Sequence, residues 1–497
     1  MFSYNEKQHE NYCTKGGKSM TALAWIGVMF IIAVILRAKI NFLGRSLVPA
    51  CVIAGVIGFI LMNTCGLGGS KAGDYGYISG QLYTFLFINM GVTLAAKKLD
   101  TPQKEKIKNL KELRARMGDS MFSGIFGMGS YWALAYSFQA LIGFGILCLI
   151  GKYWDMDPTY GLLISFAFAQ GPGQAVTYGA QMEAAGWSHA IQVGITFASV
   201  GFLVAFILGV PYAKKGIKMG IASSKIRLSP DVAFGFYEPE KQEPYGKITT
   251  FGGNLDVLTF HIALVGVAWI LGTYLGKLWG LFPGYFGQLF SMLLFFNGML
   301  CGYGLRWIIG RLGVSKYLDR GTQLRIGGAC TDIMVTAAFM AIDMDIVGKW
   351  MVPITIICVV VSGVTWVTIK YFGARFGGSN DFERILGEWG TATGTNATGL
   401  SLVRIVDPEA ETTTAAELGP ANIVNVPASY FVMPAILAFA AKTMTQISMI
   451  LCLVAVLVGY LIFMRVVGVW GKKTFDMNKG EKYKDGKLIM KDGKPVN

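Results

Sequence analysis

The sequence has little charge and few of the residues on which most enzymes depend. Only 15% of its 497 residues are charged, against about 25% in a soluble globular protein, and only three are histidine. It has no HExxH, GxSxG or paired-carboxylate pattern, and the stretch GTATGTN lacks the lysine of a phosphate-binding loop. These absences argue against an enzyme, against ATP-driven transport by this chain alone and against a bound cofactor.

The cysteines and the basic residues exclude two further classes. The eight cysteines include no CxxC pair and no His/Cys cluster, so we expect small packing residues rather than metal ligands or disulfides. The net charge of +14 would suit nucleic acid, but the basic residues lie in loops between apolar runs. The positive-inside bias of membrane proteins explains that distribution better, and we expect no nucleic-acid partner.

Apolar residues are abundant. They make up 53% of the chain and form runs long enough to cross a lipid bilayer, which predicts an all-α polytopic membrane protein. We expect eleven spans: 21–37, 46–64, 80–96, 121–150, 188–212, 256–279, 284–304, 326–343, 350–371, 418–441 and 446–466.

Two regions, 159–186 and 382–404, do not fit as ordinary spans. Each has a short helix-compatible arm, a Gly-rich break and a second arm. The arm Thr159–Gln170 is roughly 18 Å of helix, against a hydrocarbon core of about 30 Å, and is too short to cross. We therefore expect two re-entrant hairpins. The alternatives are a kinked ordinary span for the first region and a Thr-rich cytoplasmic loop for the second.

Loop charges predict the orientation. If the hairpins do not cross and the N-terminus is outside, the basic loops 97–118 and 305–325 and the lysine-rich tail all face the cytoplasm. This asymmetry predicts an inner-membrane protein with its N-terminus outside and its C-terminus inside. Loop 97–118 is either an amphipathic surface helix or a solvated connector, and the tail is either strand–turn–strand or a disordered extension.

The order of elements repeats. Four spans, a hairpin and one span fill 21–212, and the same series fills 256–441. Each repeat crosses five times, so the second is inverted, and hairpins 159–186 and 382–404 enter from opposite sides. Inverted repeats with broken helices are typical of secondary transporters. The remaining parts are an extracytoplasmic tail (1–20), a cytoplasmic linker (213–255), an extra span (446–466) and a basic cytoplasmic tail (467–497).

The hairpin tips carry the candidate binding residues. A helix that begins at mid-membrane presents unpaired N–H groups and a positive dipole end, which suit a carboxylate. Irregular backbone at this depth is tolerated only where it lines a cavity or is buried in protein. We therefore expect the substrate to bind Gln170, Gly171, Pro172, Gly173, Gln174, Glu388, Gly390, Thr391, Thr393, Gly394, Thr395 and Asn396.

Glu388 is the most informative acidic residue, because a carboxylate inside a membrane is costly and usually functional. It would pair with a substrate ammonium group or with a coupling cation; the alternative is an interfacial residue that answers Arg384 or Arg404. Helix-to-helix hydrogen bonding is the alternative for the polar residues within spans. Sodium is expected near Asn89, Thr177, Asp332 and Thr398.

Five stretches carry a family resemblance: LVPACVIAG (47–55), LFINMGV (86–92), MDPTYGLLISFAFAQGPGQA (156–175), GEWGTATGTNATG (387–399) and LGPANIVNVPASYFVMP (418–434). In these stretches the chain resembles the sodium/glutamate symporter family of bacteria. The resemblance implies sodium-coupled symport of glutamate or a related carboxylate-bearing amino acid, a homodimer, and elevator-like movement of a core that holds both hairpins. A cation-coupled carrier of another small organic anion and an ion channel are the alternatives.

Overall fold

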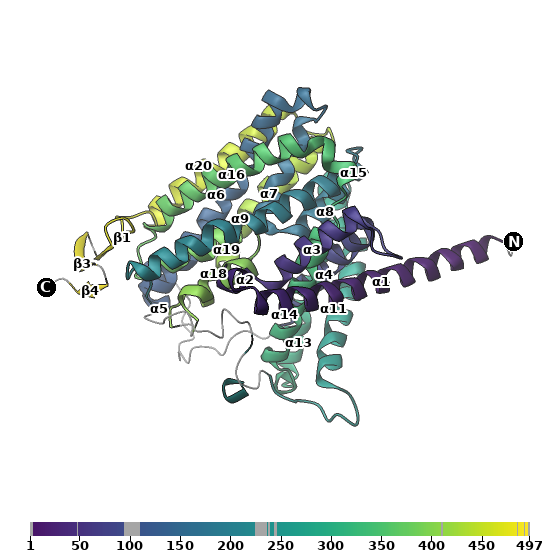
Figure 1. Cartoon of the computed structure of the whole chain (residues 1–497), viewed down its shortest axis with the longest axis horizontal. Helices are drawn as coiled ribbons and strands as arrows, with labels where there is room; N and C mark the ends of the chain where they lie inside the picture. Colours follow the sequence, from purple (N-terminus) through teal and green to yellow (C-terminus); the bar gives the residue numbers. More distant parts are fainter. Residues whose placement is uncertain are drawn as a thin grey trace. The chain divides into compact units, whose positions relative to one another are not determined.

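The structure is a computed structural model that describes residues 3–46, 48–93, 110–223, 236, 239–242, 246–408, 411–484, 486–491 and 493–495. The described chain is mostly helical (Figure 1), as the apolar runs predict. Much of the loop 97–118, which we expected to be either a surface helix or a solvated connector, lies outside the described residues. Only α5 (Leu110–Met117) and the residues next to it are described there. The linker 213–255 is also described only in part.

Seven described helices are long and apolar enough to cross a membrane. They are Ser19–Lys39, Asp119–Tyr153, Ala190–Lys218, Val257–Trp279, Met344–Gly373, Thr414–Ala440 and Gln446–Val467. Each coincides with one predicted span, the first with 21–37 and the last with 446–466. The structure therefore supports a polytopic membrane protein.

The other four predicted spans are helical but fall short in length or apolarity. α3 (Ala50–Thr64) is apolar but only 15 residues long. α4 (Ala72–Val92) and α14 (Arg320–Met340) are long enough but carry more polar residues. The run 284–304 is divided at Leu293 between α12 (Tyr285–Met292) and α13 (Leu294–Arg311).

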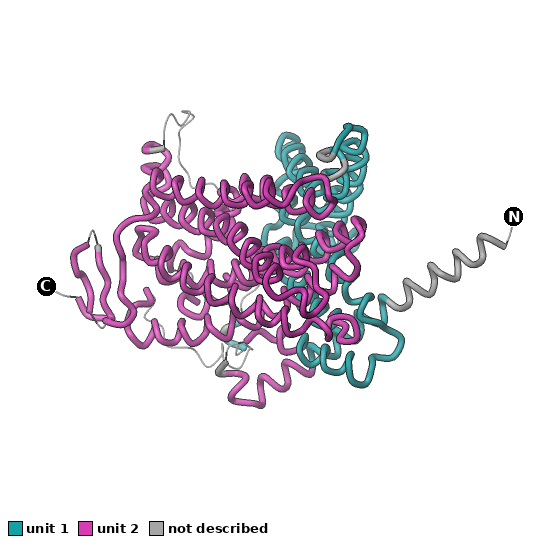
Figure 2. The backbone as a smooth tube through the Cα atoms, turned by 90° about the horizontal axis from the view of Figure 1, so that it is seen from above, with its two compact units in different colours: residues 1–31, 54–105, 236–341 teal, residues 32–53, 106–235, 342–497 magenta. Residues whose placement is uncertain are grey.

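The chain forms two compact units, drawn in teal and magenta in Figure 2. Unit 1 comprises Met1–Ile31, Ala54–Glu105 and Phe236–Ala341, and unit 2 comprises Ile32–Ile53, Lys106–Gly235 and Ile342–Asn497. Unit 1 therefore contains most of α1 (Ser3–Lys39) and α3, together with α4, η3 (Pro239–Lys241), α11 (Val257–Trp279), α12, α13, η4 (Ser315–Tyr317) and α14.

Close helix contacts hold unit 1 together. α4 packs against α13 and α14, and α11 packs against α13. A Cβ atom at Gly91 would lie 2.4 Å from the Met299 carbonyl oxygen, and one at Gly272 would lie 2.5 Å from the Cα atom of Gly298. Small residues at such contacts let membrane helices approach closely, so these glycines set the packing of α4, α11 and α13.

Capping residues set the start of two helices in unit 1. The Asp256 carboxylate accepts hydrogen bonds from backbone N–H groups in the first turn of α11, and Asp319 accepts one from Thr322 in the first turn of α14. Each bond satisfies N–H groups that have no partner within the helix. Burial raises the pKa of Asp319, but hydrogen bonds from Thr322, Lys247 and Gly321 together outweigh it and hold the pKa below its usual value.

Unit 2 contains the remaining elements, including both regions predicted as hairpins. Its helices are α2 (Asn41–Ser46), α5, α6 (Asp119–Ile150), η1 (Gly151–Tyr153), η2 (Pro158–Leu162), α7 (Leu163–Gln170), α8 (Pro172–Ala184), α9 (Ala190–Lys218), α15 (Met344–Val347), η5 (Gly348–Trp350), α16 (Met351–Gly373), α17 (Asp381–Ala392), α18 (Asn396–Val406), α19 (Thr414–Ala440) and α20 (Gln446–Val467). α6 packs against α19 and α20, and α9 packs against α7, α8, α17 and α18.

The C-terminal tail adds a small antiparallel sheet in the order β1-β2-β3-β4. Its strands are β1 (Phe475–Asp476), β2 (Glu481–Lys484), β3 (Lys487–Lys491) and β4 (Lys494–Pro495). This confirms the strand–turn–strand alternative for the tail, and it adds the sheet to a fold that the sequence predicted to be all-α.

Candidate functional site

The first predicted hairpin consists of α7 and α8, which we call the first helix pair. The two helices meet at Gly171, whose φ of +80° lies in the region that favours glycine. Pro172 follows as the first residue of α8, where a missing N–H costs nothing. With 8 and 13 residues, α7 and α8 are roughly 12 and 20 Å long, so each is shorter than a hydrocarbon core of about 30 Å.

The second predicted hairpin consists of α17 and α18, the second helix pair. These helices have 12 and 11 residues, again too few to cross a bilayer. The Thr395 hydroxyl caps α18 by accepting a hydrogen bond from the Thr398 N–H. A Cβ atom at Gly390 would lie 2.6 Å from the backbone nitrogen of Gly399, so Gly390 serves the close packing of α17 on α18.

The tips of the two helix pairs lie against each other within unit 2. A Cβ atom at Gly171 would lie 2.6 Å from the Thr395 Cγ2 atom and 2.9 Å from the Gly394 carbonyl oxygen. α8 begins at Pro172, and α18 begins at Asn396. α8 and α18 therefore both begin at one contact point. The sequence analysis predicted the binding site at these two tips.

The two amides at the first tip form a hydrogen-bonded chain. The Tyr136 hydroxyl donates to Gln174 Oε1 at 2.8 Å, and Gln174 Nε2 donates to Gln170 Oε1 at 2.8 Å. Gln174 is buried, whereas Gln170 is half-buried. Gln174 is thus fixed by its neighbours, and Gln170 lies at the more open end of the chain.

One face of α6 positions both helix pairs, which the sequence analysis missed. Trp132 Nε1 donates to the Ala169 carbonyl at 2.7 Å, near the end of α7. Gln139 Nε2 donates to the Ala392 carbonyl at 2.9 Å, the last residue of α17. With Tyr136, these residues recur at helical spacing in SYWALAYSFQA. A row of polar side chains along one face of an otherwise apolar helix could have identified these residues from the sequence.

The predicted threonines divide into two groups. Thr391 and Thr393 are fully buried, and each hydroxyl donates to the carbonyl four residues earlier in α17. Thr395 and Asn396 at the start of α18 are half-buried. Thr391 and Thr393 therefore stabilise α17, whereas Thr395 and Asn396 are the accessible residues at the tip.

Glu388 lies on α17 and is only 1% exposed. Its Oε1 atom has no hydrogen-bond partner among the described residues. Arg384 does not answer it, because that guanidinium binds Asp381 and Glu417 instead, and Arg404 is exposed. The interfacial alternative therefore lacks the Arg384 contact on which it partly rested.

A buried ion network holds the base of the second helix pair. Arg384 Nη1 lies 2.8 Å from Asp381, and its Nε and Nη2 atoms each lie 2.8 Å from Glu417 on α19. All three side chains are at most 1% exposed. Sequence reasoning missed this network. Its signal was the cluster of charged residues in DFER at the start of an apolar arm.

The C-terminal tail contacts the same base. The Thr474 hydroxyl donates to Asp381 at 2.8 Å, and the Phe475 and Phe382 rings are 5.9 Å apart. On the other side of α17, Glu383 accepts a hydrogen bond from the Ser223 N–H at 2.6 Å. Burial lowers the pKa of Lys482 in β2, and the nearby Glu383 carboxylate opposes part of that shift.

The residues predicted to hold sodium fall in different units. Thr177 and Thr398 belong to unit 2, whereas Asn89 and Asp332 belong to unit 1. Asn89 is buried and donates to the Gln323 carbonyl at 2.9 Å, a helix-to-helix bond between α4 and α14; Asp332 is exposed. Among the described residues, no group of three or more His, Cys, Asp or Glu side chains is placed to hold a metal ion.

Comparison with known proteins gives one family. The model of the sodium/glutamate symporter family matches residues 126–379, just over half of the chain. The chain belongs to the sodium/glutamate symporter family. The family match begins in α6, includes the first helix pair and ends just before α17. No curated protein matches the chain.

Family membership confirms the resemblance that the five sequence stretches indicated. Together with seven apolar helices of spanning length, it makes the chain a multi-pass membrane protein of a symporter family.

Proposed function

We propose that this protein is a secondary active transporter that couples sodium to the uptake of glutamate or a related carboxylate-bearing amino acid. The observation that carries the proposal is the contact of Gly171 with Gly394 and Thr395. It brings together the N-terminal ends of α8 and α18, whose positive dipole ends and first-turn N–H groups suit anions, with the Thr398 N–H already capped by Thr395. A substrate with two carboxylates has one for each helix end.

The buried Glu388 carboxylate supplies the opposite charge. An ionised carboxylate at bilayer depth is costly unless a cation accompanies it. The substrate ammonium group or the coupling sodium ion would fill that role. Hydroxyls of Thr177 and Thr398 and carbonyls at the tips offer oxygen ligands for sodium within unit 2, as in transporters with broken helices. The remaining proposed contacts are Gln170, Pro172, Gly173, Gln174, Gly390, Thr391, Thr393 and Asn396.

Two re-entrant hairpins in inverted repeats are part of the proposal. Their arms are shorter than a bilayer core, and the packing is reciprocal. Three helix contacts have counterparts when α6, α7, α8 and α9 are matched with α16, α17, α18 and α19. The α6–α7 contact corresponds to α16–α17, the α8–α9 contact to α18–α19, and the α6–α19 contact to α16–α9. Such matched contacts are what a duplicated segment would make.

The division of the chain supports an elevator-like mechanism. Unit 1 takes its helices mainly from the early part of each repeat, and unit 2 takes the later part with both helix pairs. An elevator needs a substrate-carrying core that is distinct from a scaffold. We place the protein in the inner membrane with the N-terminus outside and the C-terminus in the cytoplasm, because the basic loops are then cytoplasmic. The homodimer is part of the proposal through the family resemblance alone.

Uptake of labelled glutamate into proteoliposomes tests the proposal. We expect accumulation with an inward sodium gradient and none when potassium replaces sodium at the same membrane potential. Unlabelled glutamate should compete better than 2-oxoglutarate, which has both carboxylates but no ammonium group. Stronger competition by 2-oxoglutarate would favour a carrier of organic anions, and sodium-independent uptake would reject symport with sodium.

A further inference from the structure

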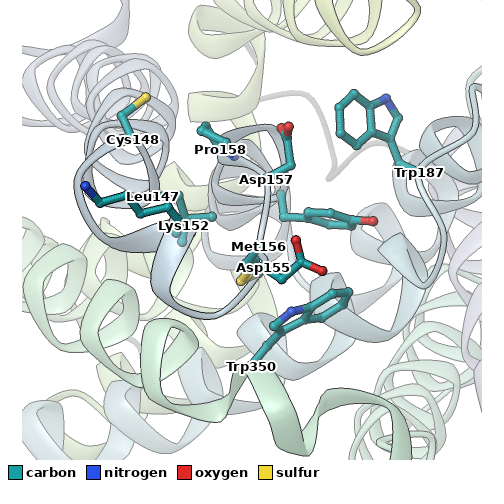
Figure 3. Close-up of a pocket in the computed structure, with 11 residues that line it drawn as sticks. Leu147, Cys148, Lys152, Asp155, Met156, Asp157, Pro158, Trp187 and Trp350 are labelled. Atoms are coloured by element: carbon teal, nitrogen blue, oxygen red, sulfur yellow. The ribbon is translucent and has the colours of Figure 1, made fainter.

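A pocket lies at the base of the first helix pair (Figure 3), away from the tips. Its volume is about 450 Å³, within the range of small-molecule sites. Its walls come from the end of α6, from the segment Gly151–Tyr160, from Trp187 after α8, and from Trp350 in η5. All of these elements belong to unit 2.

Three aromatic rings line the pocket and are held in place. The Tyr160 ring meets Trp187 edge-on at 5.8 Å and lies 5.2 Å from the Trp350 ring. The polar atom of each ring donates to a backbone carbonyl at 2.8–3.1 Å. The hydrogen-bonding needs of the rings are therefore met within the protein, and the surfaces they offer to a ligand are their π-systems.

The charged groups of the pocket favour a cation. Asp155 and Asp157 contribute two carboxylates, against the single ammonium group of Lys152. Figure 3 shows both carboxylates on the side of Trp187 and Trp350, whereas the Lys152 side chain points to the opposite side. Asp157 is fixed by accepting a hydrogen bond from the Thr159 N–H at 2.8 Å. Asp155 is held at a φ of +50°, a conformation that non-glycine residues rarely adopt.

Aromatic faces combined with negative charge recognise ammonium groups by cation–π attraction. The Trp350 ring already makes one cation–π contact, with Lys349 Nζ 4.4 Å from its centroid. Lys349 itself does not line the pocket. We infer that this pocket binds a small organic cation bearing an ammonium group. The inference does not depend on the proposed transport reaction.

Binding there would act on the first helix pair. η2, which contains Tyr160, runs directly into α7. Trp350 is the last residue of η5, and α16 begins at the next residue. A cation bound against these rings would contact both η2, which leads into α7, and the start of α16. The pocket is thus placed to influence the tip without contacting it.

Choline binding to the purified full-length protein tests the inference. Its neutral isostere, 3,3-dimethylbutan-1-ol, has the same shape without the charge. We expect calorimetry to detect binding of choline and no binding of the alcohol. The double variant Asp155→Asn/Asp157→Asn should raise the Kd for choline about tenfold or more, because charge is removed while asparagine preserves the cap and tolerates positive φ. Asp345→Asn, at an exposed site outside the pocket, should leave the Kd unchanged.

Three results would overturn the inference. Equal binding of choline and the alcohol, or an unchanged Kd in the double variant, would show that charge at this pocket is not recognised. Displacement of choline by glutamate that is equally strong in the double variant would place the cation at the helix tips instead. Choline binding that depends on the two aspartates, in a protein that fails to transport glutamate, would support the pocket and reject the proposed function alone.

Discussion

The two helix pairs are alike at their tips and different at their bases. At each tip a short helix ends, a glycine-containing break follows, and a second helix starts beside the other tip. At the base of the first pair, Asp157 caps η2 and three aromatic rings surround an open pocket. At the base of the second pair, Arg384 is locked between Asp381 and Glu417, and the C-terminal tail lies against them.

The comparison indicates that the geometry of the tips is constrained in both pairs, whereas the polar groups at the bases are free to differ. The shared tip geometry fits the task that we propose for both pairs, since both second helices would then present their N-terminal ends at one point. The bases have no common task, so their polar groups differ. The second base is closed by a buried ion network, whereas the first remains accessible to a ligand.

Breaking the ion network should have the largest effect on stability. Arg384→Met leaves Asp381 and Glu417 as buried carboxylates without their cation, which costs about 3–5 kcal/mol. Arg114→Met is the matched control, because the Arg114–Asp119 pair is exposed and contributes about 1 kcal/mol or less. Thermal unfolding in detergent measures both. Equal melting temperatures for the two variants would show that the network does not stabilise the second base.

Gly171→Ala should disrupt the contact between the tips. The new methyl group meets Thr395 Cγ2 and the Gly394 carbonyl, and the φ of +80° with a ψ of −173° adds about 1–3 kcal/mol of strain. We expect at least a tenfold loss of sodium-driven glutamate uptake. Gly145→Ala is the control, since nothing lies within 4 Å of its Cβ position. Adding Thr395→Ser removes the clashing Cγ2 atom and should restore part of the uptake; no restoration would argue that the loss arises elsewhere.

Glu388→Gln tests the buried charge on α17. The variant keeps the shape of the side chain but removes the carboxylate that we propose to accompany a cation. We expect uptake to fall about tenfold or to need more sodium for half-maximal rate, as judged from uptake at a series of sodium concentrations. Glu411→Gln makes the same change at an exposed position and should transport normally. Wild-type sodium dependence in the Glu388 variant would remove this residue from the site.

Thr474→Val should give the smallest effect, because it removes only the hydroxyl that joins the tail to the second base. The bonds to Asp381 and the Ala374 carbonyl are lost, and we expect a destabilisation of about 1–2 kcal/mol. Thr355→Val, whose hydroxyl bonds only within α16, is the control in thermal unfolding. A variant as stable as its control would show that the tail rests on the base without stabilising it.

Sequence reasoning located the helices and the breaks, but it did not anticipate which polar residues bond to one another. It placed Gly171 and Thr395 at the tips, where the structure also has them in contact. It took 121–150 only as a long span and so overlooked Tyr136, which bonds Gln174. It also considered Arg384 as a partner for Glu388. In the structure Arg384 binds Glu417 instead, 33 residues further along the chain.

The sequence by itself determined the apolar runs, the shortness of the four helix arms and the break at Gly171-Pro172. These are local properties, set by composition, by the helical rise per residue and by the dihedral limits of glycine and proline. Only the tertiary structure decided that the Gly171 and Thr395 tips touch, that Arg384 binds Glu417, and that Asn89 bonds the Gln323 carbonyl. Each of those contacts joins segments far apart in the chain, and a buried polar group binds whichever partner the packing of its helices brings within reach.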